Sequence, residues 1–389
     1  MLTTLAIAFT AALAQEPAPA APPAPAAIAQ PAAALIPKAA PAEDGEEDVA
    51  FRFTVVPGIG WNAQPDATVD GFSTGFVGQA AAVDGVDAQL GLSIVEGRVD
   101  GVQASVGLSM AEEIDGLQLS SMVNLVDGEV RVGQLSGAVN VAGGDVVGLQ
   151  GAGFVNIAGG NVHGVQAAAA VNIAGGEQSE GVQASGGVNI ADGIEGIQAA
   201  PVNIAETVEG AQAGVLNIGG DVDGLQIGVI NVARTSKVSI APLNFIGDGL
   251  HRVDVWSSES AVVSGGLKFG SKHVYTLLAA GWVGEDQPWW TWGGGFGVHI
   301  QHDRLWAEID DSVWGISSGN VVAPGVHNKL RLQVGADLVH RHVAPFVGVS
   351  VNTWFGTGAV TPRAVDLPSR VSEGGRIVTW PGVHAGISF

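Results

Sequence analysis

Hydrophobic and polar positions alternate in a phrase that recurs along residues 71–246. Each copy begins with Gly, an aliphatic residue and Gln. A patch of small residues follows, and then an aliphatic residue, Asn and a second aliphatic residue. Residues 148–150 lead in this way to residues 155–157, and residues 224–226 lead to residues 230–232. The copies follow one another at 13 to 17 residues, which indicates a repeat with two short β-type runs in each unit.

The polar positions of the phrase form two series along the chain. The Gln position, or the residue that replaces it, falls at Ser73, Asp87, Gln103, Gln118, Gln134, Gln150, Gln166, Gln183, Gln198, Gln212, Gln226 and, in a worn copy, Ser239. The Asn position falls at Ser93, Ser109, Asn124, Asn140, Asn156, Asn172, Asn189, Asn203, Asn217, Asn231 and Asn244.

Two folds fit this repeat: a β-solenoid with one coil per unit, and a single large membrane barrel of about twenty strands with one strand per unit. The Gln-to-Asn distance shortens from six residues to five at Asn203. In a continuous strand this deletion would turn half the side chains to the wrong face, whereas a coil absorbs it at a corner. The unit is also single rather than a hairpin, and Phe154 is the only Phe, Trp or Tyr between residues 81 and 240. The sequence therefore favours the solenoid and keeps the large barrel as the alternative.

In the solenoid, the aliphatic residues beside each Gln and Asn are expected to point inward, with Leu225 and Ile227 on one sheet and Ile230 and Val232 on the other. The Gln and Asn side chains would then point outward as two ladders that could bind a ligand. An Asn could also turn inward and bond to the backbone of a corner.

At this point the chain resembles a known family. The phrase Gly-Val-Gln…Val-Asn-Ile/Val-Ala-Gly-Gly is similar to that of bacterial surface-repeat proteins of uncharacterised function. Residues 55–60 resemble the stretch that precedes their repeats, and residues 254–269 resemble the stretch that follows them. The resemblance covers most of residues 51–280. It implies a location in the cell envelope or on the cell surface and no known reaction, so no catalytic residue follows from it.

After Asn244 the pattern changes to alternating runs of about ten residues, separated by tight and long gaps in turn. This predicts an antiparallel barrel of about eight strands of the outer-membrane type. The expected strands are residues 250–256, 261–269, 273–283, 290–301, 304–314, 328–339, 343–355 and 377–389. An even number of strands would place both barrel ends, and hence the repeats, on the tight-turn, periplasmic side. If the short first strand did not form, the topology would be inverted and the repeats could lie outside.

Side-chain patterns support this barrel over a soluble β-sandwich. The terminal Phe389 resembles the closing-strand signal of outer-membrane proteins. Alternate residues should face the lipid at Leu330, Leu332, Val334, Ala336 and Leu338, and the lumen at Lys329, Arg331, Gln333 and Asp337. An aromatic belt at one membrane interface is expected from tryptophans near the long loops, namely Trp256, Trp282, Trp290, Trp292, Trp314 and Trp354.

The N-terminus indicates export. Residues 1–14 form a short apolar run that ends in Ala-Leu-Ala, as in a signal peptide. Residues 15–50 are rich in Pro and Ala and end in acidic residues, which predicts an extended linker. The expected domains are therefore the signal peptide, this linker, the solenoid at 51–247 and the barrel at 248–389.

Composition excludes several classes of function. With 16 Lys and Arg against 38 Asp and Glu, the net charge of −22 argues against a nucleic-acid partner. The absence of Cys excludes disulfides, thiolate metal sites and a Cys nucleophile. No apolar run reaches the ~18 residues of a membrane-spanning helix.

The remaining chemical motifs are weak. Residues 71–75 match the letters of the Gly-x-Ser-x-Gly elbow around Ser73, but no helical pattern follows. Residues 219–225 faintly resemble a calcium-binding repeat, and solvated acidic corners explain them better. His340 and His342 share a face at a tight turn, which permits a metal without requiring one. Glu308 and Asp310 share a face, and pairing with Lys268 and Arg331 is a simpler role for them than acid–base catalysis.

The sequence therefore predicts a non-enzymatic protein of a Gram-negative type of envelope, exported and anchored in the outer membrane, with a structural, adhesive or binding role. No cofactor and no metal are expected. The expected partners are membrane lipid, the barrel-assembly machinery and another envelope component or surface ligand. A channel formed by one large barrel is the alternative function, and an enzyme built on Glu308 and Asp310 is a weaker third.

Overall fold

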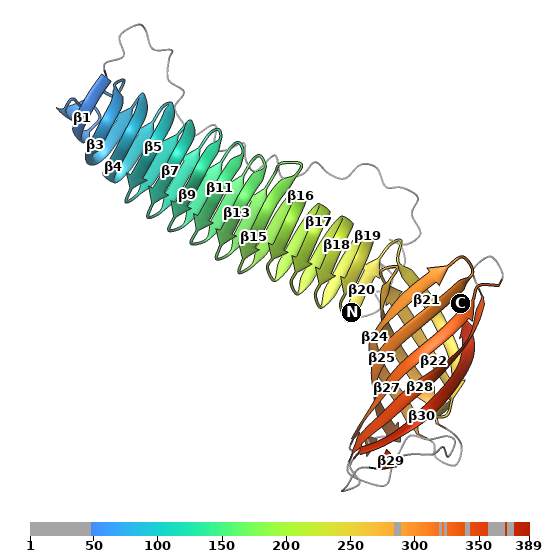
Figure 1. Cartoon of the computed structure of the whole chain (residues 1–389). Coiled ribbons are helices and arrows are strands. Elements are labelled where there is room, and N and C mark those ends of the chain that lie inside the picture. The colour runs from blue at the N-terminus through green and yellow to red at the C-terminus, as the bar shows by residue number, and fades with distance from the viewer. Residues whose placement is uncertain are drawn as a thin grey trace, which may run out of the picture. The chain divides into compact units, whose positions relative to one another are not determined.

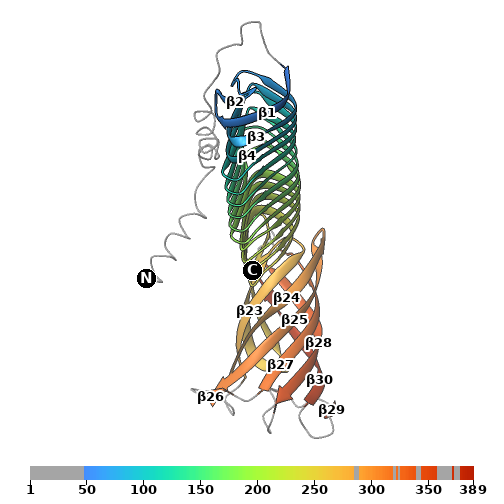
Figure 2. The same cartoon turned by 90° about the vertical axis from the view of Figure 1, so that its left-hand side faces the viewer.

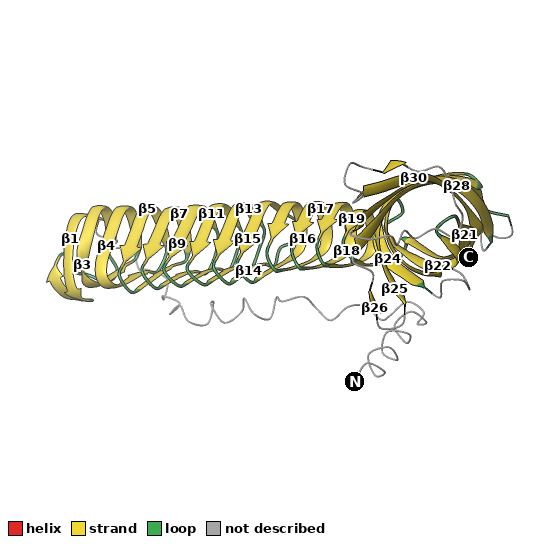
Figure 3. Cartoon of the chain, turned by 90° about the horizontal axis from the view of Figure 1, so that it is seen from below, coloured by secondary structure: helices red, strands yellow, loops and turns green. Residues whose placement is uncertain are grey.

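The computed structural model describes residues 48–283, 289–318, 321–322, 325–338, 343–356, 370–371 and 377–389. These residues form strands and turns, as Figure 3 shows. No helix among them is suited to crossing a membrane. A 20-stranded sheet contains β1 to β20, and a 10-stranded sheet contains β21 to β30. The predicted fold class, a β-solenoid followed by an antiparallel barrel, is confirmed. The predicted signal peptide and nearly all of the predicted linker lie outside the described residues.

Contacts divide the chain into two units, which are described separately. The first is Met1–Gly164 with Ile173–Glu177, and the second is Val165–Asn172 with Gln178–Phe389. The division falls within the repeats, so each unit contains a set of coils, and the second also contains the barrel. Figure 1 shows the coils and the barrel strands.

Each coil of the solenoid contributes a Gln run and an Asn run. In the earlier coils the two runs are separate strands. The Gln strands are β5 (Arg98–Ser105), β7 (Glu113–Ser120), β9 (Val130–Ser136), β11 (Val146–Ala152), β13 (Val162–Ala168) and β15 (Ser179–Ser185). The Asn strands are β6 (Leu108–Ala111), β8 (Val123–Val126), β10 (Val139–Ala142), β12 (Val155–Ala158) and β14 (Val171–Ala174).

Other strands of the solenoid pass through a corner without a break, so that one strand carries the Asn run of one repeat and the Gln run of the next. These are β16 (Val188–Ala199), β17 (Val202–Ala213), β18 (Leu216–Ile227) and β19 (Ile230–Ile240), followed by the short β20 (Leu243–Ile246). At the N-terminal end lie β1 (Asp48–Val56), β2 (Ile59–Trp61), β3 (Thr68–Ala80) and β4 (Ala82–Val95).

Successive repeats pair in parallel, with equivalent residues opposite one another. In the first unit Asn140 of β10 is opposite Asn156 of β12. In the second unit β16 and β17 align Asn189 with Asn203 and Gln198 with Gln212. A membrane barrel built from one strand per repeat would pair neighbouring strands antiparallel. The large-barrel alternative is therefore wrong.

The shortened Gln-to-Asn distance is absorbed at a corner, as predicted. Residues 200–201 form this corner between β16 and β17, and the Asn203 amide donates to the Ala200 carbonyl at 3.1 Å. On both sides of the corner the parallel register with the neighbouring strand is kept. The deletion therefore changes the corner and leaves the columns of side chains intact.

The backbone conformation explains why the repeated phrase begins with Gly. Gly148 has φ +117°, a region that only Gly enters without strain. A Cβ on Gly148 would collide with the Val132 carbonyl of the preceding coil. Val132 itself stands at a Gly position of the phrase and has φ +77°, so one copy accepts this strain.

The solenoid starts with a coil that the repeated phrase does not mark. β1 pairs in parallel with β3, and its Arg52 lies opposite Ser73, so Arg52 occupies the Gln column. β2 folds back antiparallel on β1, as Figure 2 shows. The register confirms that Ser73 and Asp87 take the Gln position and that Ser93 and Ser109 take the Asn position.

The barrel is a closed antiparallel sheet. Its long strands are β21 (Leu250–Ser258), β22 (Ala261–Gly270), β23 (Val274–Trp282), β24 (Trp290–His302), β25 (Leu305–Ser318), β27 (Gly325–Ala336), β28 (Ala344–Gly356) and β30 (Ile377–Ser388). The short β26 (Val321–Val322) pairs with β25, and β29 (Arg370–Val371) pairs with β30. Pairing of β21 with β30 closes the sheet.

Each predicted barrel strand overlaps one of the long strands, so the expected strand order is confirmed. The first strand forms, as the non-inverted topology requires. Val253 of β21 exchanges backbone hydrogen bonds with Phe389 at 3.0 and 2.9 Å. The start of the first strand and the C-terminus therefore lie at the same, tight-turn end of the barrel, as expected.

Candidate functional site

The Gln side chains of the repeat lie inside the solenoid. Their exposure is 0–1%, so the expectation of an outward-facing binding ladder is wrong for this series. Seven of these amides are seen to donate to the Gln of the preceding coil. In the first unit Gln134 donates to Gln118 at 2.8 Å, and in the second Gln226 donates to Gln212 at 2.8 Å. The buried series comprises Gln103, Gln118, Gln134, Gln150, Gln166, Gln183, Gln198, Gln212 and Gln226.

The Asn side chains form a second internal ladder that runs in the opposite direction. Asn124 donates to Asn140 of the following coil at 2.9 Å, and Asn217 donates to Asn231 at 2.9 Å. The inward orientation that was left open for Asn is the one observed. The series with no exposed surface comprises Asn124, Asn140, Asn156, Asn172, Asn189, Asn203, Asn217 and Asn231.

The same amides also donate to backbone carbonyls, and these hydrogen bonds join the Gln run of a coil to its Asn run. Gln150 donates to the Ile157 carbonyl at 3.1 Å, and Asn156 donates to the Gln150 carbonyl at 3.0 Å. The ladders therefore hold the coil together from inside. Because the amides are buried, a ligand on the surface of the folded solenoid cannot reach them.

The solenoid instead exposes aliphatic residues. The expectation that Leu225, Ile227, Ile230 and Val232 point inward is wrong, because all four are partly or fully exposed. Aliphatic or aromatic residues beside a Gln, or two residues before an Asn, are among the most exposed in the repeats. They include Met122, Leu149, Phe154, Val165, Val182, Ile197, Val215, Ile227 and Val229. The surface available to a partner therefore carries exposed aliphatic side chains as well as the acidic residues of the corners.

The polar N-terminal end of the core is a closed cluster. Arg52 donates to Ser73 Oγ at 3.1 Å and to the Gln79 carbonyl at 2.6 Å. Its guanidinium lies 3.8 Å from the Asp87 carboxylate. Ser73 is buried in the middle of β3, so the strand-to-helix turn of a nucleophile elbow is missing there. The cluster is suited to ending the Gln ladder rather than to catalysis.

Some acidic corner residues of the second unit pair with cations. Arg234 contacts Asp221 at 2.6 Å, and Lys237 pairs with Asp223. Hydrogen bonds from Arg234 and then Thr235 lower the pKa of Asp221. Across the described residues, His, Cys, Asp and Glu nowhere gather in threes to hold a metal ion. The predicted His340 and His342 pair lies outside the described residues.

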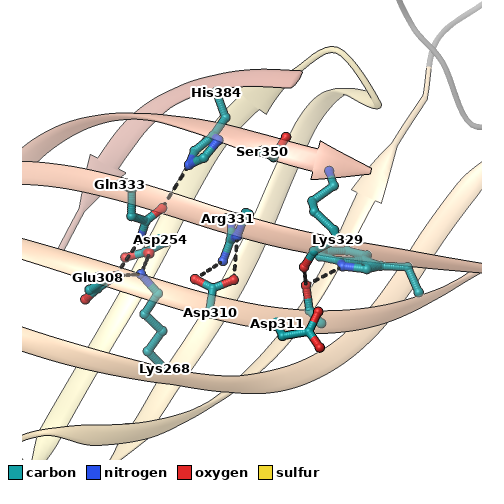
Figure 4. Close-up of polar contacts among 12 residues, drawn as sticks. Asp254, Lys268, Glu308, Asp310, Asp311, Lys329, Arg331, Gln333, Ser350 and His384 are labelled. Carbon is teal, nitrogen blue, oxygen red and sulfur yellow. Dashed lines mark hydrogen bonds and ion pairs between the residues drawn. The ribbon is translucent and has the colours of Figure 1, made fainter. Parts of the chain in front are cut away.

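The barrel lumen contains a network of buried ion pairs (Figure 4). Lys268 lies 2.5 Å from both Asp254 and Glu308. Arg331 donates to the two oxygens of Asp310 at 2.8 and 3.1 Å. The predicted pairing of Glu308 and Asp310 with Lys268 and Arg331 is therefore confirmed. Asp337, also predicted in this lumen, lies 3.5 Å from Arg252.

Further hydrogen bonds occupy the two candidate catalytic carboxylates. His299 lies 2.8 Å from Glu308, and the Tyr275 hydroxyl donates to Asp310 at 2.9 Å. Both carboxylates are almost fully buried. Charged groups with this many partners in an enclosed lumen are suited to holding barrel strands together.

Alternation along β27 separates lumen from exterior as predicted. Lys329, Arg331, Gln333 and Asp337 are buried, whereas Leu330, Leu332, Val334 and Leu338 are exposed. The outer surface carries exposed aliphatic and aromatic residues on every long strand of the barrel. An apolar exterior around a charged interior is the reverse of the usual arrangement in a soluble protein.

The predicted tryptophan belt is only partly correct. Trp290 and Trp292 are exposed at 57% and 56%, and Trp282 is half-buried. Trp256, Trp314 and Trp354 instead point into the lumen and are 2–3% exposed. Inside, the Arg331 guanidinium lies over the Trp256 ring at 4.9 Å, and Lys329 lies over Trp314 at 5.6 Å. These cation–π contacts give a physical reason for the inward positions.

Sequence reasoning missed several residues of the lumen. Arg252 and Asp254 alternate with the outward-facing Val253 and Val255 on β21. Their positions in this alternation could have identified them as lumen residues. Glu259 follows β21 directly in a tight turn and is buried, and no sequence pattern indicated this.

Comparison with protein-family models, with curated proteins and with solved structures found no match to this chain.

Proposed function

We propose that the C-terminal barrel anchors the protein in an outer membrane. The observation that carries this proposal is the division of its side chains: aliphatic and aromatic residues cover the exterior, and paired charges fill the interior. In a bilayer a strand must satisfy its backbone groups within a closed sheet, as the pairing of β21 with β30 allows. An exterior of this kind is stable against lipid and costly against water.

The barrel serves as an anchor rather than a channel in this proposal. Eight strands enclose a lumen that side chains can fill. Lys268 and Glu308 form an ion pair across it, and Arg331 pairs with Asp310 of the neighbouring strand. A water-filled pore would need these pairs to separate.

The solenoid supplies a structural or binding surface in this proposal. Its amides are used internally, so its partners would meet exposed aliphatic residues such as Leu149 and Val215. Large exposed apolar surfaces mark sites of protein or lipid association. The resemblance to bacterial surface-repeat proteins and the predicted signal peptide at 1–14 add support for an envelope location. Membrane lipid and the barrel-assembly machinery would be the partners of the barrel.

Expression of the full chain in a Gram-negative host tests the anchor. The protein should fractionate with the outer membrane and require detergent for extraction. It should also migrate differently on a denaturing gel before and after boiling, because folded barrels resist unfolding by the detergent. In planar bilayers it should give no large, steady conductance.

Two outcomes would contradict the proposal. Recovery of the folded full chain from the periplasm without detergent would exclude the membrane anchor. A large open conductance from the purified protein would exclude the filled lumen and favour transport.

A further inference from the structure

The solenoid begins with a hairpin that exposes apolar side chains. β1 and β2 pair antiparallel, with Phe53 opposite Trp61 and Val56 opposite Ile59, at the N-terminal end of the coils (Figure 2). Val56 is exposed, Ile59 is 61% exposed and Trp61 is 65% exposed. Residues 53–65 contain no Asp, Glu, Lys or Arg. The hairpin therefore presents an apolar and uncharged surface to its surroundings.

Aromatic side chains extend this apolar surface onto the first coils. The Phe51 ring lies 5.6 Å from the Trp61 ring and stacks on the Phe72 ring at 6.0 Å. All three side chains are exposed, and together they form an aromatic platform. By contrast, residues 81–240 contain Phe154 as their only Phe, Trp or Tyr. Exposed aromatic residues are thus concentrated at this end of the first unit.

The turn of the hairpin keeps several of its backbone groups bonded inside the protein. Pro57 has no N–H, and the Gly58 N–H donates to the Ala63 carbonyl at 2.9 Å. The Asn62 side chain donates to the Phe51 carbonyl at 3.0 Å. Backbone groups that keep such hydrogen bonds can leave water at small cost. The hairpin can therefore enter an apolar environment in its folded form.

Charge around the hairpin discriminates between possible occupants. Asp48 and Asp70 are exposed near the aromatic platform, and the whole chain has a net charge of −22. In a symmetric contact between two copies the same surfaces meet, so these carboxylates would repel their counterparts. A zwitterionic bilayer carries no net charge and accepts apolar segments with tryptophan at the level of its headgroups. Such a bilayer fits this surface better than a second copy does.

We propose that the β1–β2 hairpin binds the surface of a zwitterionic phospholipid bilayer. Val56 and Ile59 enter the acyl region, and Trp61 lies among the headgroups. This contact goes beyond the proposed anchor and does not rest on it, because the hairpin belongs to the solenoid. Anionic lipid should weaken the contact by repelling the acidic chain, and salt should restore it by screening that repulsion.

A fluorescent dye on the hairpin tests this contact in the full chain, because the natural chain has no Cys. Ile59→Cys carries an environment-sensitive dye at the hairpin, and Phe154→Cys carries it at another exposed position of the first unit. The protein is held in phosphatidylcholine nanodiscs by its barrel, and phosphatidylcholine vesicles are added. Spin-labelled acyl chains, which quench the dye on contact, are placed in the vesicles or, in a second set, in the nanodiscs.

We expect the dye at position 59 to shift to the blue and to be quenched from one of these bilayers, whereas the dye at position 154 should not respond. Trp61→Ser should weaken the binding at least about tenfold, on the scale of one apolar side chain withdrawn from lipid. Val56→Glu should weaken it as strongly by placing a charge at the turn, without altering the ring contact between Phe51 and Trp61. Phe154→Ser is the matched control and should leave the binding unchanged.

Three outcomes would overturn the hairpin contact. The first is no quenching at position 59 from either bilayer, or equal quenching at positions 59 and 154. The second is a blue shift that grows with protein concentration in the absence of vesicles, which would show self-association instead. The third is tighter binding when phosphatidylglycerol is added to the lipid. If the barrel does not insert into nanodiscs, the soluble full chain is mixed with the same vesicles, so failure of the anchor is distinguishable from failure of the hairpin.

Discussion

At the scale of the residue, the repeat depends on amides that satisfy one another. Gln134 donates to Gln118 and to the Val141 carbonyl at 2.8 and 3.3 Å, and it accepts from Gln150 at 2.9 Å. A carboxamide has two donor hydrogens and one acceptor oxygen, and all are used here. Buried amides are costly only when unpaired. Stacking in register therefore makes Gln and Asn acceptable core residues.

Asn140→Ala tests this dependence. Asn140 accepts from Asn124 and donates to Asn156 and to the Gly151 carbonyl. Its loss should lower the free energy of unfolding by about 1–3 kcal/mol for each buried group left without a partner. Val141→Ala, one residue along the same strand and half-buried, should cost less than about 1 kcal/mol. Chemical denaturation followed by circular dichroism measures both, and equal losses would contradict the ladder.

At the scale of the element, the opposite directions of the ladders decide how they end. The donor ends meet serines: Gln103 donates to Ser93 Oγ at 2.7 Å, and Asn231 donates to Ser239 Oγ at 2.8 Å. The acceptor ends, Asn124 Oδ1 and Gln226 Oε1, are buried and have no hydrogen-bond donor. At three of the four ends the neighbouring copy has lost its amide, whereas beyond Asn231 the column continues with Asn244, to which Ser239 forms the link.

Ser109→Asn should extend the Asn ladder by one coil. Ser109 lies opposite Asn124 in the parallel register, so an amide there can donate to Asn124 Oδ1. In the next coil a serine in the same column as Ser105, Ser120, already occurs together with Asn124. The new Asn beside Ser105 would repeat this combination. We expect a gain of about 0.5–1.5 kcal/mol, seen as a higher thermal midpoint. Ser121→Asn at an exposed corner is the control. A midpoint that does not rise above the control would show that the column cannot accept the larger side chain.

The corners between coils respond to pH. Burial and then the nearby Glu206 charge raise the pKa of Asp192 above its ordinary 3.8. A raised pKa means that the folded protein favours the protonated form, so this stabilisation is complete below pH 3.8 and is lost as pH rises through the folded pKa. Asp192→Asn should therefore stabilise the fold at pH 7 by less than about 1 kcal/mol and have little effect near pH 3.

Asp221→Asn is the matched control for Asp192→Asn. Hydrogen bonds from Arg234 lower the pKa of Asp221, so its contribution is present at neutral pH and lost on acidification. Removing this charge should destabilise the fold at pH 7. Thermal melts of the full chain at both pH values measure the two effects. The same sign for both variants at pH 7 would contradict the electrostatic account.

At the scale of the whole molecule, solenoid and barrel both hold polar side chains inside and expose aliphatic ones, although the solenoid interior also contains buried aliphatic residues such as Val130 and Val146. In the solenoid the interior polar groups are neutral amides in register, as between Gln198 and Gln212. In the barrel they are charges on different strands, as between Lys268 and Glu308. The barrel exterior is suited to lipid, and we propose that the solenoid exterior is suited to an apolar partner.

The sequence by itself determined the spacing of the repeats and the two-residue alternation of the barrel strands. The spacing of Gln and Asn located the coils, and the one-residue deletion at Asn203 favoured coils over one continuous strand per repeat. Ser73 and Asp87 were identified as members of the Gln column. In the barrel, the alternation from Lys329 to Leu338 placed each residue on its correct side, because charged residues next to aliphatic ones identify the lumen of a membrane barrel.

Only the tertiary structure decided which face of each repeat is inside. A two-residue alternation separates two faces but does not say which one is buried. Hydrophobicity alone predicts that Leu225 and Ile227 are buried, yet Gln226 lies between them inside the coil. The reason is cooperative: the amide of Gln226 is satisfied by Gln212 of the preceding coil, and this partner exists only once coils have stacked in register. The inward turn of Trp256 and Trp314 was decided in the same way, by cations that strands distant in sequence bring to their rings.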